Sequence, residues 1–567
     1  MTGVKTLTRA APLLLGLAMV LLLLGPALAP GLVLSYDLAW SPVPRWTPFV
    51  LGVDVPAPRA VPSDAVAVAL GTLVTPAIAQ KLVLVLVLVL AATGVAALLR
   101  HLRPDLPVAA GLAAVIGALW NPFVGERLVV GHWTVLLGYA VLPWLWRAVL
   151  CVRAGGSSVR SVAGWLALAS AGGANSLVIA LFGVAALFAT GVPWRARVAG
   201  VLVWLGSAAA WALPALAGPT TRVEAGVAEF SPEADTPMGA VVSLLSGGGF
   251  WNSATHPPER SGWAVALLAT ALAVAAAGAA GWQLWRRGAR PLLVMAALSL
   301  LVCTVSAVAG MSGLWSALVM GIPGGGLLRD SHKLLAPWVV LLALGMGLVV
   351  GVLVERSRLH SWTGPAAAVL IAVPVLLLPS LFWGMSGRLQ TVEVPADYLA
   401  VADTASQLPP GEMGLLPWNQ YRRYAWNSSR VSLTLAPRLI DHRFLFDDSL
   451  PLAQGTVAGE DPRAERVSRR IAQGADPIDA LVSEGVDYVA IELDTGIPVS
   501  VPGGVGQIVA ESDHLAIVQV GQVDETRRTP AGGNAWLGVG WTVTVLTWSA
   551  VSLGVASSRL RRSYRPV

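Results

Sequence analysis

The feature that most constrains this chain is a series of apolar runs of about 18 to 23 residues. A helix of that length, rising ~1.5 Å per residue, crosses a hydrocarbon core of ~30 Å. Such runs exclude a transmembrane β-barrel, whose strands alternate over only ~10 residues. Composition agrees, because 55% of the residues are hydrophobic and only 12% are charged. This charged fraction is far below that of soluble domains. The sequence therefore predicts an all-α polytopic membrane protein.

Hydropathy predicts about twelve transmembrane helices. We expect them near 11–32, 82–99, 107–120, 133–150, 161–173, 176–191, 198–217, 263–285, 291–310, 335–354, 364–386 and 535–556. The block 161–191 is too long for one ordinary crossing, so we interpret it as two short or re-entrant helices around its central glycines. The block 64–80 is bracketed by polar residues, and we place it on the outer interface.

The distribution of basic residues predicts the orientation of the chain. An even number of spans puts both termini on one side, and lysines and arginines gather on one set of short connections, as is typical of cytoplasmic segments. These residues are Lys5, Arg9, Arg100, Arg103, Arg147, Arg153, Arg160, Arg195, Arg197, Arg286, Arg287, Arg290, Arg356, Arg358, Arg559, Arg561, Arg562 and Arg565. Both termini are therefore expected in the cytoplasm of a multi-pass plasma-membrane protein. The same bias explains the net charge of +6, so we expect membrane lipids and no nucleic acid among its partners.

The long segments then fall on the extracytoplasmic side, and one of them is long enough to be a domain. Its helix-like runs (396–408, 463–473 and 477–484) alternate with strand-like runs (413–417, 486–493 and 515–520), a pattern typical of a small α/β unit. We therefore divide the chain into a transmembrane domain (1–386), an extracytoplasmic α/β domain (387–534), and a final helix with a basic cytoplasmic tail (535–567).

Polar residues that could carry chemistry gather just outside the outer ends of the spans. The first cluster, Tyr36 and Asp37, follows the first span. A carboxylate at this interface could accept a proton from a sugar hydroxyl during attack on an anomeric carbon. The alternative is a loop aspartate that caps the following turn.

The second cluster occupies 121–133, which we expect to be a short outer connection between the third and fourth spans. It contains Glu126, Arg127 and His132. These side chains could orient an acceptor, and Glu126 with His132 could hold a divalent cation. The alternative is a surface ion-pair network at a helix hairpin.

The third cluster is a glycine-rich turn that leads into Arg329, His332 and Lys333 just before the tenth span. Backbone donors and cations at this place suit the phosphate of a lipid carrier. Basic residues are depleted on most outer short connections, which favours an anionic partner here; ordinary snorkelling at a span end is the alternative.

Aromatic residues give a weaker signal for carbohydrate. Trp251 lies in a long outer loop, and Trp418 and Tyr421 lie in the α/β domain among amide and guanidinium donors. Sugar C–H faces pack on aromatic rings while the hydroxyls need polar partners. Many of the tryptophans could instead belong to a membrane-interface belt.

These features together resemble a known family. An uncleaved first helix, Asp37 in the first outer loop, an interfacial segment in that loop, about a dozen spans and an outer C-terminal domain look like the GT-C superfamily of polytopic glycosyltransferases. The segments YD (36–37), NPFVGER (121–127), GHW (131–133) and RDSHK (329–333) are similar to segments of actinobacterial integral membrane proteins. Those proteins are related to the arabinofuranosyl- and mannosyltransferases of cell-envelope synthesis.

The resemblance implies transfer of a sugar from a polyprenyl-phosphate-linked donor to an envelope glycan or glycolipid. Asp37 would be the general base, and Arg329, His332 and Lys333 would hold the leaving phosphate. The side chains implied to line the acceptor side are Tyr36, Glu126, Arg127, His132, Trp251, Trp418 and Tyr421. Many GT-C enzymes carry two adjacent acidic residues in the first loop, whereas Asp37 stands alone, with Asp54 and Asp64 further on. The identity of the base and the need for a divalent cation therefore stay open.

Two other functions remain open beside the transferase. A transporter or flippase needs a polar path through the bundle, but the spans contain almost no ionisable residues away from their ends. A non-catalytic GT-C-like envelope assembly protein would keep the architecture without a shared site. If the chain is a transferase, in contrast, we expect five side chains to converge on one outer-face cavity, because the acceptor base and the donor phosphate must meet. They are Asp37, Glu126, His132, Arg329 and Lys333.

Overall fold

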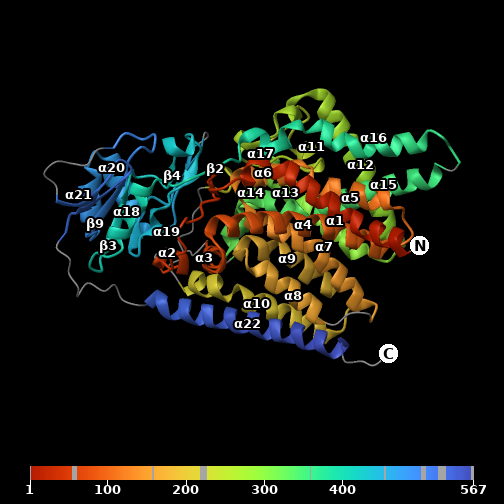
Figure 1. Cartoon of the computed structure of the whole chain (residues 1–567), viewed down its shortest axis with the longest axis horizontal. Coiled ribbons are helices and arrows are strands. Elements are labelled where there is room, and N and C mark those ends of the chain that lie inside the picture. The colour runs from red at the N-terminus through yellow and green to blue at the C-terminus, as the bar shows by residue number, and fades with distance from the viewer. Residues whose placement is uncertain are drawn as a thin grey trace.

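The chain forms a helical body with a sheet-containing region at one end (Figure 1). The computed structural model describes residues 2–53, 60–155, 159–217, 226–322, 324–357, 359–452, 455–499, 506–521 and 532–563; Asp54 lies outside them. We call residues 391–521 the sheet region. The predicted fold class, a helical membrane protein with a small α/β part, is confirmed.

Within the described residues, eight helices are long and apolar enough to cross a membrane, and the number rises to ten if each of two bent pairs is one span. The eight are α1 (Thr2–Leu24), α4 (Pro76–Leu102), α7 (Trp133–Arg153), α10 (Trp194–Ala217), α12 (Trp263–Arg286), α13 (Arg290–Ala307), α15 (Ala336–Arg356) and α22 (Gly532–Ser563). The bent pairs are α5 (Val108–Leu119) with α6 (Pro122–Val130), and α16 (Thr363–Leu377) with a segment containing α17 (Phe382–Gly387). All ten lie where the apolar runs predicted spans.

The other two expected spans are shorter helices. The block 161–191 forms α8 (Val159–Ser170) and α9 (Gly173–Ala189), which break apart at the predicted glycines. At ~1.5 Å per residue, their 12 and 17 residues reach less than the ~30 Å of a bilayer core. Gly173 allows the break, since its φ is +62° and a Cβ there would lie 2.8 Å from the carbonyl oxygen of Val61.

The segment 64–80 does not cross the membrane as one helix. It divides into α3 (Ser63–Leu73) and the first turn of α4, which begins at Pro76 after an N-cap at Thr75. The 11 residues of α3 are too few for a crossing.

The prediction of a short outer connection at 121–133 is wrong in one respect, because most of this segment is a buried helix. Asn121 caps α6 by accepting a hydrogen bond from the backbone of Val124, and Pro122 occupies the first helical position. The bend of 40° after α5 turns α6 inward, and all nine of its residues are buried. Glu126 and Arg127 therefore do not form a surface network.

The sheet region contains a five-stranded mixed sheet. Its order is β10-β11-β9-β3-β6, with β3 parallel to both neighbours and the other pairs antiparallel. The strands are β3 (Glu412–Leu416), β6 (Arg443–Leu445), β9 (Tyr488–Glu492), β10 (Gln507–Glu511) and β11 (Leu515–Gln519). The three predicted strands are β3, β9 and β11 at the centre, while the unpredicted β6 and β10 are the edges.

Alternation along the strands gives the sheet two buried faces. Val489 and Ile491 of β9 pack with residues of α20 (Pro462–Ala472) and α21 (Pro477–Val482). Tyr488 and Ala490 belong instead to the core that includes α18 (Ala396–Ala405) and the helical body. This period of two is what a strand covered on both faces requires.

The sheet region is joined by backbone pairing to the loop after α1, which the sequence predicts to be the first outer loop. β1 (Leu32–Val33) pairs antiparallel with β2 (Thr391–Val392), directly after the first span. Further on, Tyr36 donates to the carbonyl of Val431 at 2.6 Å and accepts from the amide of Leu433 at 2.9 Å. The loop thus lies along β5 (Ser432–Leu433), which itself pairs with β4 (Tyr421–Arg422).

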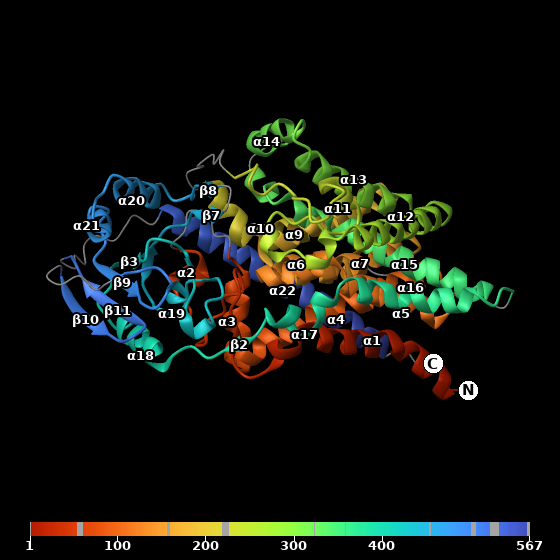
Figure 2. The same ribbon diagram turned by 90° about the horizontal axis from the view of Figure 1, so that it is seen from above.

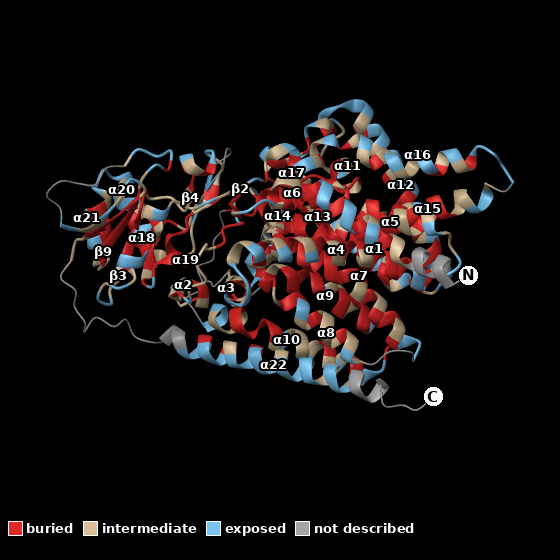
Figure 3. Ribbon diagram, in the orientation of Figure 1, coloured by how far each residue is buried: buried red, intermediate tan, exposed pale blue. Residues whose placement is uncertain are grey.

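The helices of the body differ in how deeply they are buried. In both views α22 runs from the side of the sheet region along α10 to the opposite end of the body, where α1 begins (Figures 1 and 2). The outer face of α22 is exposed, and only 11% of its span is buried, whereas 83% of the α7 span is buried (Figure 3). This is the burial expected for a lipid-facing helix and a central one.

Orientation in the membrane can be tested by cysteine labelling. In a background with Cys151 and Cys303 replaced by alanine, Asp513→Cys in the sheet region should react with an impermeant maleimide in intact cells. Ser361→Cys, exposed between α15 and α16, should react only after permeabilisation, because neighbouring basic residues mark a cytoplasmic segment. The opposite pattern would contradict the extracytoplasmic placement of the sheet region.

Candidate active site where the helical body meets the sheet region

Asp37 is positioned by its backbone at the junction of the helical body and the sheet region. Its amide donates to the carbonyl oxygen of Val130 at 3.0 Å, at the end of α6. The preceding residue, Tyr36, has a φ of +46°, an uncommon left-handed conformation that turns the loop so that Asp37 faces α7. The Asp37 side chain is 39% exposed, so its carboxylate is reachable from outside.

Gly131 makes the close contact between this loop and α6 possible. It ends α6 with a φ of +80°, and a Cβ at this position would lie 2.4 Å from the backbone nitrogen of Leu38. Glycine tolerates both the conformation and the distance, whereas any other residue would clash. The next residue, His132, is thereby placed opposite Asp37.

Two side chains hold the carboxylate of Asp37. His132 Nε2 lies 2.9 Å from Oδ2, and the hydroxyl of Tyr421 donates to Oδ1 at 3.0 Å. Burial works to raise the pKa of Asp37, but the hydrogen bonds from His132 and Tyr421, with the nearby charge of Arg438, hold it below its usual value. Asp37 is therefore ionised at neutral pH.

Tyr421 reaches this place because its neighbour is anchored in the sheet region. Arg422 Nε donates to Glu492 at 2.6 Å, and both side chains are fully buried. The same carboxylate accepts from the hydroxyl of Tyr424 at 2.6 Å. This fully partnered pair fixes β4, so the adjacent Tyr421 projects towards the first outer loop.

Arg127, a fully buried side chain, connects His132 to two further groups. Its Nη1 lies 2.7 Å from both His132 Nδ1 and Asp330 Oδ2. Its Nη2 lies 3.1 Å from Asp330 Oδ1 and 3.0 Å from His332 Nδ1. Burial works to raise the pKa of Asp330, but the charge of Arg127 holds it well below its usual range. The ring of Phe250 covers the guanidinium at 4.3 Å.

This arrangement assigns the tautomer of His132. Arginine donates and cannot accept, so Nδ1 of His132 must be the acceptor. The proton of the neutral ring then resides on Nε2, from which it is donated to Asp37. His332 follows the same rule, since its Nδ1 faces Arg127 and its Nε2 lies 3.1 Å from the carbonyl oxygen of Gly248.

Glu126 lies beside this network without joining it by a hydrogen bond. Its side chain is fully buried, its carboxylate is 3.8 Å from His332 Nε2, and neither oxygen has a hydrogen-bond partner among the described residues. The two ring nitrogens of His132 contact Arg127 and Asp37, and not Glu126. The described residues contain no group of three or more His, Cys, Asp or Glu placed to hold a metal ion.

The three cations expected at the phosphate point to different partners. Arg329 stacks over Phe230 at 5.0 Å and lies 3.8 Å from Glu460. His332 is buried against Arg127. Lys333 donates to Asn175 at 2.9 Å, near the break between α8 and α9.

The aromatic residues are divided between two places. Trp251 packs in a cluster with Phe230 and Phe250, to which Tyr36 also packs, so it borders the site. Trp418 donates to Ser468 at 2.8 Å inside the sheet region and packs against the core under α20. No contact brings Trp418 to Asp37 among the residues that the structure describes.

The structure therefore links Asp37, His132, Arg127, His332 and Tyr421, with Glu126 adjacent. Arg329 and Trp251 lie on the neighbouring aromatic cluster, whereas Lys333 and Trp418 have other contacts. Asp330 is not among the residues predicted for the site, although it lies between predicted residues of the RDSHK segment. A carboxylate flanked by basic residues was the signal that could have identified it. Phe250 carried no such signal.

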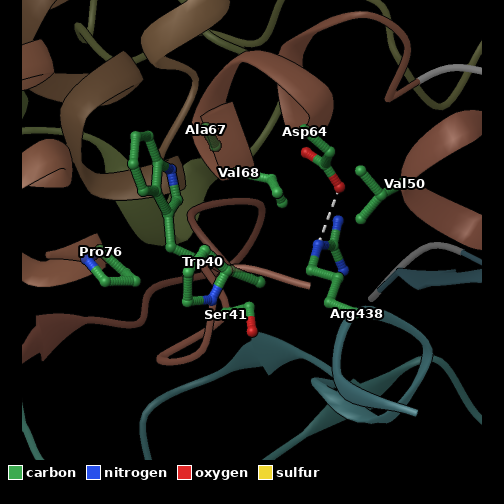
Figure 4. A pocket seen from close by; sticks show the side chains of 10 residues that line it. Trp40, Ser41, Val50, Asp64, Ala67, Val68, Pro76 and Arg438 are labelled. Carbon is green, nitrogen blue, oxygen red and sulfur yellow. Dashed lines mark hydrogen bonds and ion pairs between the residues drawn. The ribbon is translucent and has the colours of Figure 1, made fainter. Parts of the chain in front are cut away.

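Asp64, the other acidic residue considered for the first loop, lies in a separate cavity. Its Oδ2 accepts from Arg438 Nε at 2.9 Å, and Trp40, Ser41 and Pro76 line the same space (Figure 4). Burial raises the pKa of Asp64, against the opposing effect of Arg438. This ion pair joins α3 to the sheet region, which is a structural role.

Comparisons with known proteins bear on the fold. No family model matches the sequence, and no curated protein matches it. A cryo-EM structure of the arabinofuranosyltransferase AftD from mycobacteria aligns with 91% of this chain at a TM-score of 0.56 and 16% identity. A mutant of AftD aligns with 91% at a TM-score of 0.56 and 17% identity. The chain spans only 40% and 42% of the length of those two chains. What the chain shares with AftD is the fold, in agreement with the predicted helical architecture with a small α/β part.

The role of Gly131 can be tested by adding one methyl group. Gly131→Ala should lower the free energy of unfolding by about 1–3 kcal/mol, because the Cβ combines backbone strain with a clash against the first outer loop. Thermal unfolding of the purified protein in detergent would measure the change. Gly155→Ala is a matched control, since Gly155 also has a positive φ, +72°, but nothing lies within 4 Å of its Cβ position. Equal losses of stability would contradict the close contact.

Proposed function

We propose that this chain, which has the fold of AftD, is a membrane glycosyltransferase. In this proposal it transfers a sugar from a polyprenyl-phosphate-linked donor to a cell-envelope glycan or glycolipid on the extracytoplasmic face. The observation that carries the proposal is the Asp37 carboxylate, which is ionised, partly exposed and fixed where the helical body meets the sheet region. A lipid-borne donor and a water-soluble acceptor can both reach such a junction.

Asp37 is the proposed general base. A carboxylate offers about four lone-pair positions, and His132 and Tyr421 occupy one on each oxygen, so positions remain for an acceptor hydroxyl. As the hydroxyl oxygen forms a bond to the anomeric carbon, its proton passes to Asp37. The bond between that carbon and the phosphate oxygen breaks, and both electrons leave with the polyprenyl phosphate.

A cation near the leaving phosphate is the second requirement, since it stabilises the developing negative charge. Arg329 is the proposed residue, because 13% of its side chain is exposed and its aromatic neighbours border the site. Lys333 is 4% exposed and His332 is fully buried. Either could act on a phosphate only after a rearrangement of the helices around it.

A non-catalytic assembly protein is the second candidate function. It is favoured by one observation, the separation of Arg329, His332 and Lys333 onto different partners. In such a protein the Asp37 contacts would serve to dock the sheet region. Transfer assays separate the two candidates.

Asp37→Asn preserves the shape of the side chain but removes the basic oxygen. We expect it to reduce transfer from a radiolabelled polyprenyl-phosphate sugar into membrane glycans by about 10²–10⁴-fold, the usual contribution of a positioned base. Binding of polyprenyl phosphate should stay nearly unchanged. The assay compares variants at matched protein level in membranes.

Asp64→Asn tests the alternative base in the same assay, and Asp513→Asn is the control. Asp64 is the rival acid of the first loop, and Asp513 is an exposed residue of the sheet region. Undiminished transfer in Asp37→Asn would reject Asp37 as the base, and a large loss in Asp64→Asn alone would reassign it. Absence of transfer by the wild-type protein with any lipid-linked donor would favour the assembly protein.

Arg329→Ala should weaken both transfer and polyprenyl-phosphate binding, because it removes the proposed phosphate contact. A hydrogen bond to a charged group contributes about 1.5–3 kcal/mol, so we expect binding to weaken about 10- to 100-fold. Arg466→Ala, on an exposed arginine of α20, should leave both unchanged. Unaltered lipid binding in Arg329→Ala would contradict the assignment.

A further inference from the structure

A second polar cavity lies at the opposite end of the helical body from Asp37. It has a volume of about 210 Å³ and is lined by Ala97, Arg100, His101 and Arg147. These residues belong to the last turns of α4 and to the second half of α7. His132 directly precedes α7, and Arg147 lies 15 residues further along, which at ~1.5 Å per residue corresponds to roughly 20 Å.

The cavity brings together three basic side chains, those of Arg100, His101 and Arg147. Within the described residues, neither Arg100 nor Arg147 forms an ion pair, and no carboxylate lines the cavity. Two nearby acidic residues, Asp105 and Glu355, are both engaged by Arg103, at 2.7 and 3.4 Å. The Nδ1 of His101 lies 3.8 Å from the thiol of Cys151, and the side chain also feels the charge of Arg147.

Other arginines at this end of the body have partners of their own. Arg153 donates to the carbonyl oxygen of Gly288 at 2.7 Å. Arg290 stacks on Trp285 at 4.1 Å, and Arg286 lies 5.4 Å from the ring of Trp282. Snorkelling at a helix end accounts for those residues, but it does not explain why two unpaired guanidinium groups share one cavity.

We propose that this cavity binds the phosphate-bearing headgroup of an anionic phospholipid. Ala97, 8% exposed, lies on the apolar part of α4, so the cavity is at the level where the acyl core gives way to headgroups. A phosphodiester offers two charged oxygens to the two guanidinium groups, and arginine binds such groups in a fixed, bidentate geometry. The acyl chains would lie along α4 and α7.

Native mass spectrometry of the full-length protein with added phosphatidylglycerol tests this proposal. The wild type should retain phosphatidylglycerol in preference to phosphatidylcholine, because the latter carries a compensating positive charge. Arg100→Gln with Arg147→Gln should weaken phosphatidylglycerol binding about 30-fold, since each basic residue near a headgroup contributes ~1 kcal/mol. Arg100→Lys with Arg147→Lys keeps the charge but loses the bidentate geometry, so it should weaken binding less than the glutamine variant does.

The matched control is Arg195→Gln with Arg197→Gln, at the start of α10. It removes the same charge from basic residues that we also expect on the cytoplasmic side, and it should change binding less than about 2-fold if the cavity is specific. Equal loss in this control, unchanged binding in the cavity variant, or equal retention of the two lipids would overturn the proposal. Binding of inorganic phosphate to lipid-free protein as tightly as phosphatidylglycerol would also overturn it, in favour of a free-phosphate site.

Discussion

The buried guanidinium of Arg127 organises the end of the helical body that meets the sheet region. Removing a charge from water is costly, and breaking up a buried charge pair is strongly destabilising. Both terminal nitrogens of Arg127 have partners, which are Asp330 and the ring nitrogens of His132 and His332, while its Nε has none among the described residues. These partners belong to two parts of the chain some 200 residues apart. The candidate site therefore depends on a charge that does not itself face outward.

The sheet region supplies the second hydrogen-bond partner of Asp37. His132 supports one oxygen of Asp37 from the helical body, while Tyr421 supports the other from a strand 384 residues away in sequence. Backbone pairing of the first outer loop with β5 brings these two sides together. Because both supports are donors, they stabilise the ionised carboxylate. Its low pKa is thus a property of the assembled protein rather than of the loop.

The sequence predicted those features that depend on hydrophobicity and local chemistry. Long apolar runs identified the spans, short apolar runs identified the three central strands, and polar residues at span ends led to Asp37, His132 and the RDSHK segment. The burial of α6 was not predictable, because Glu126 and Arg127 are typical surface residues and their partners are distant in sequence. Tyr421 was selected for an aromatic role, yet its hydroxyl contacts Asp37 through tertiary pairing. Trp418 carried the same local signal and packs elsewhere.

The central helix α7 connects the two polar ends of the body. It begins next to His132, passes Arg147 and ends at Arg153, and it packs against α4, α8 and α9 on its way. Its high burial explains why it contains no charged residue before Arg147, since an unpaired charge within the apolar core would be costly. Charged side chains therefore occur only towards its ends. At the end near His132, tertiary partners within the chain compensate the charges. At the end near Arg147, the cavity has room for an anionic group from outside the chain.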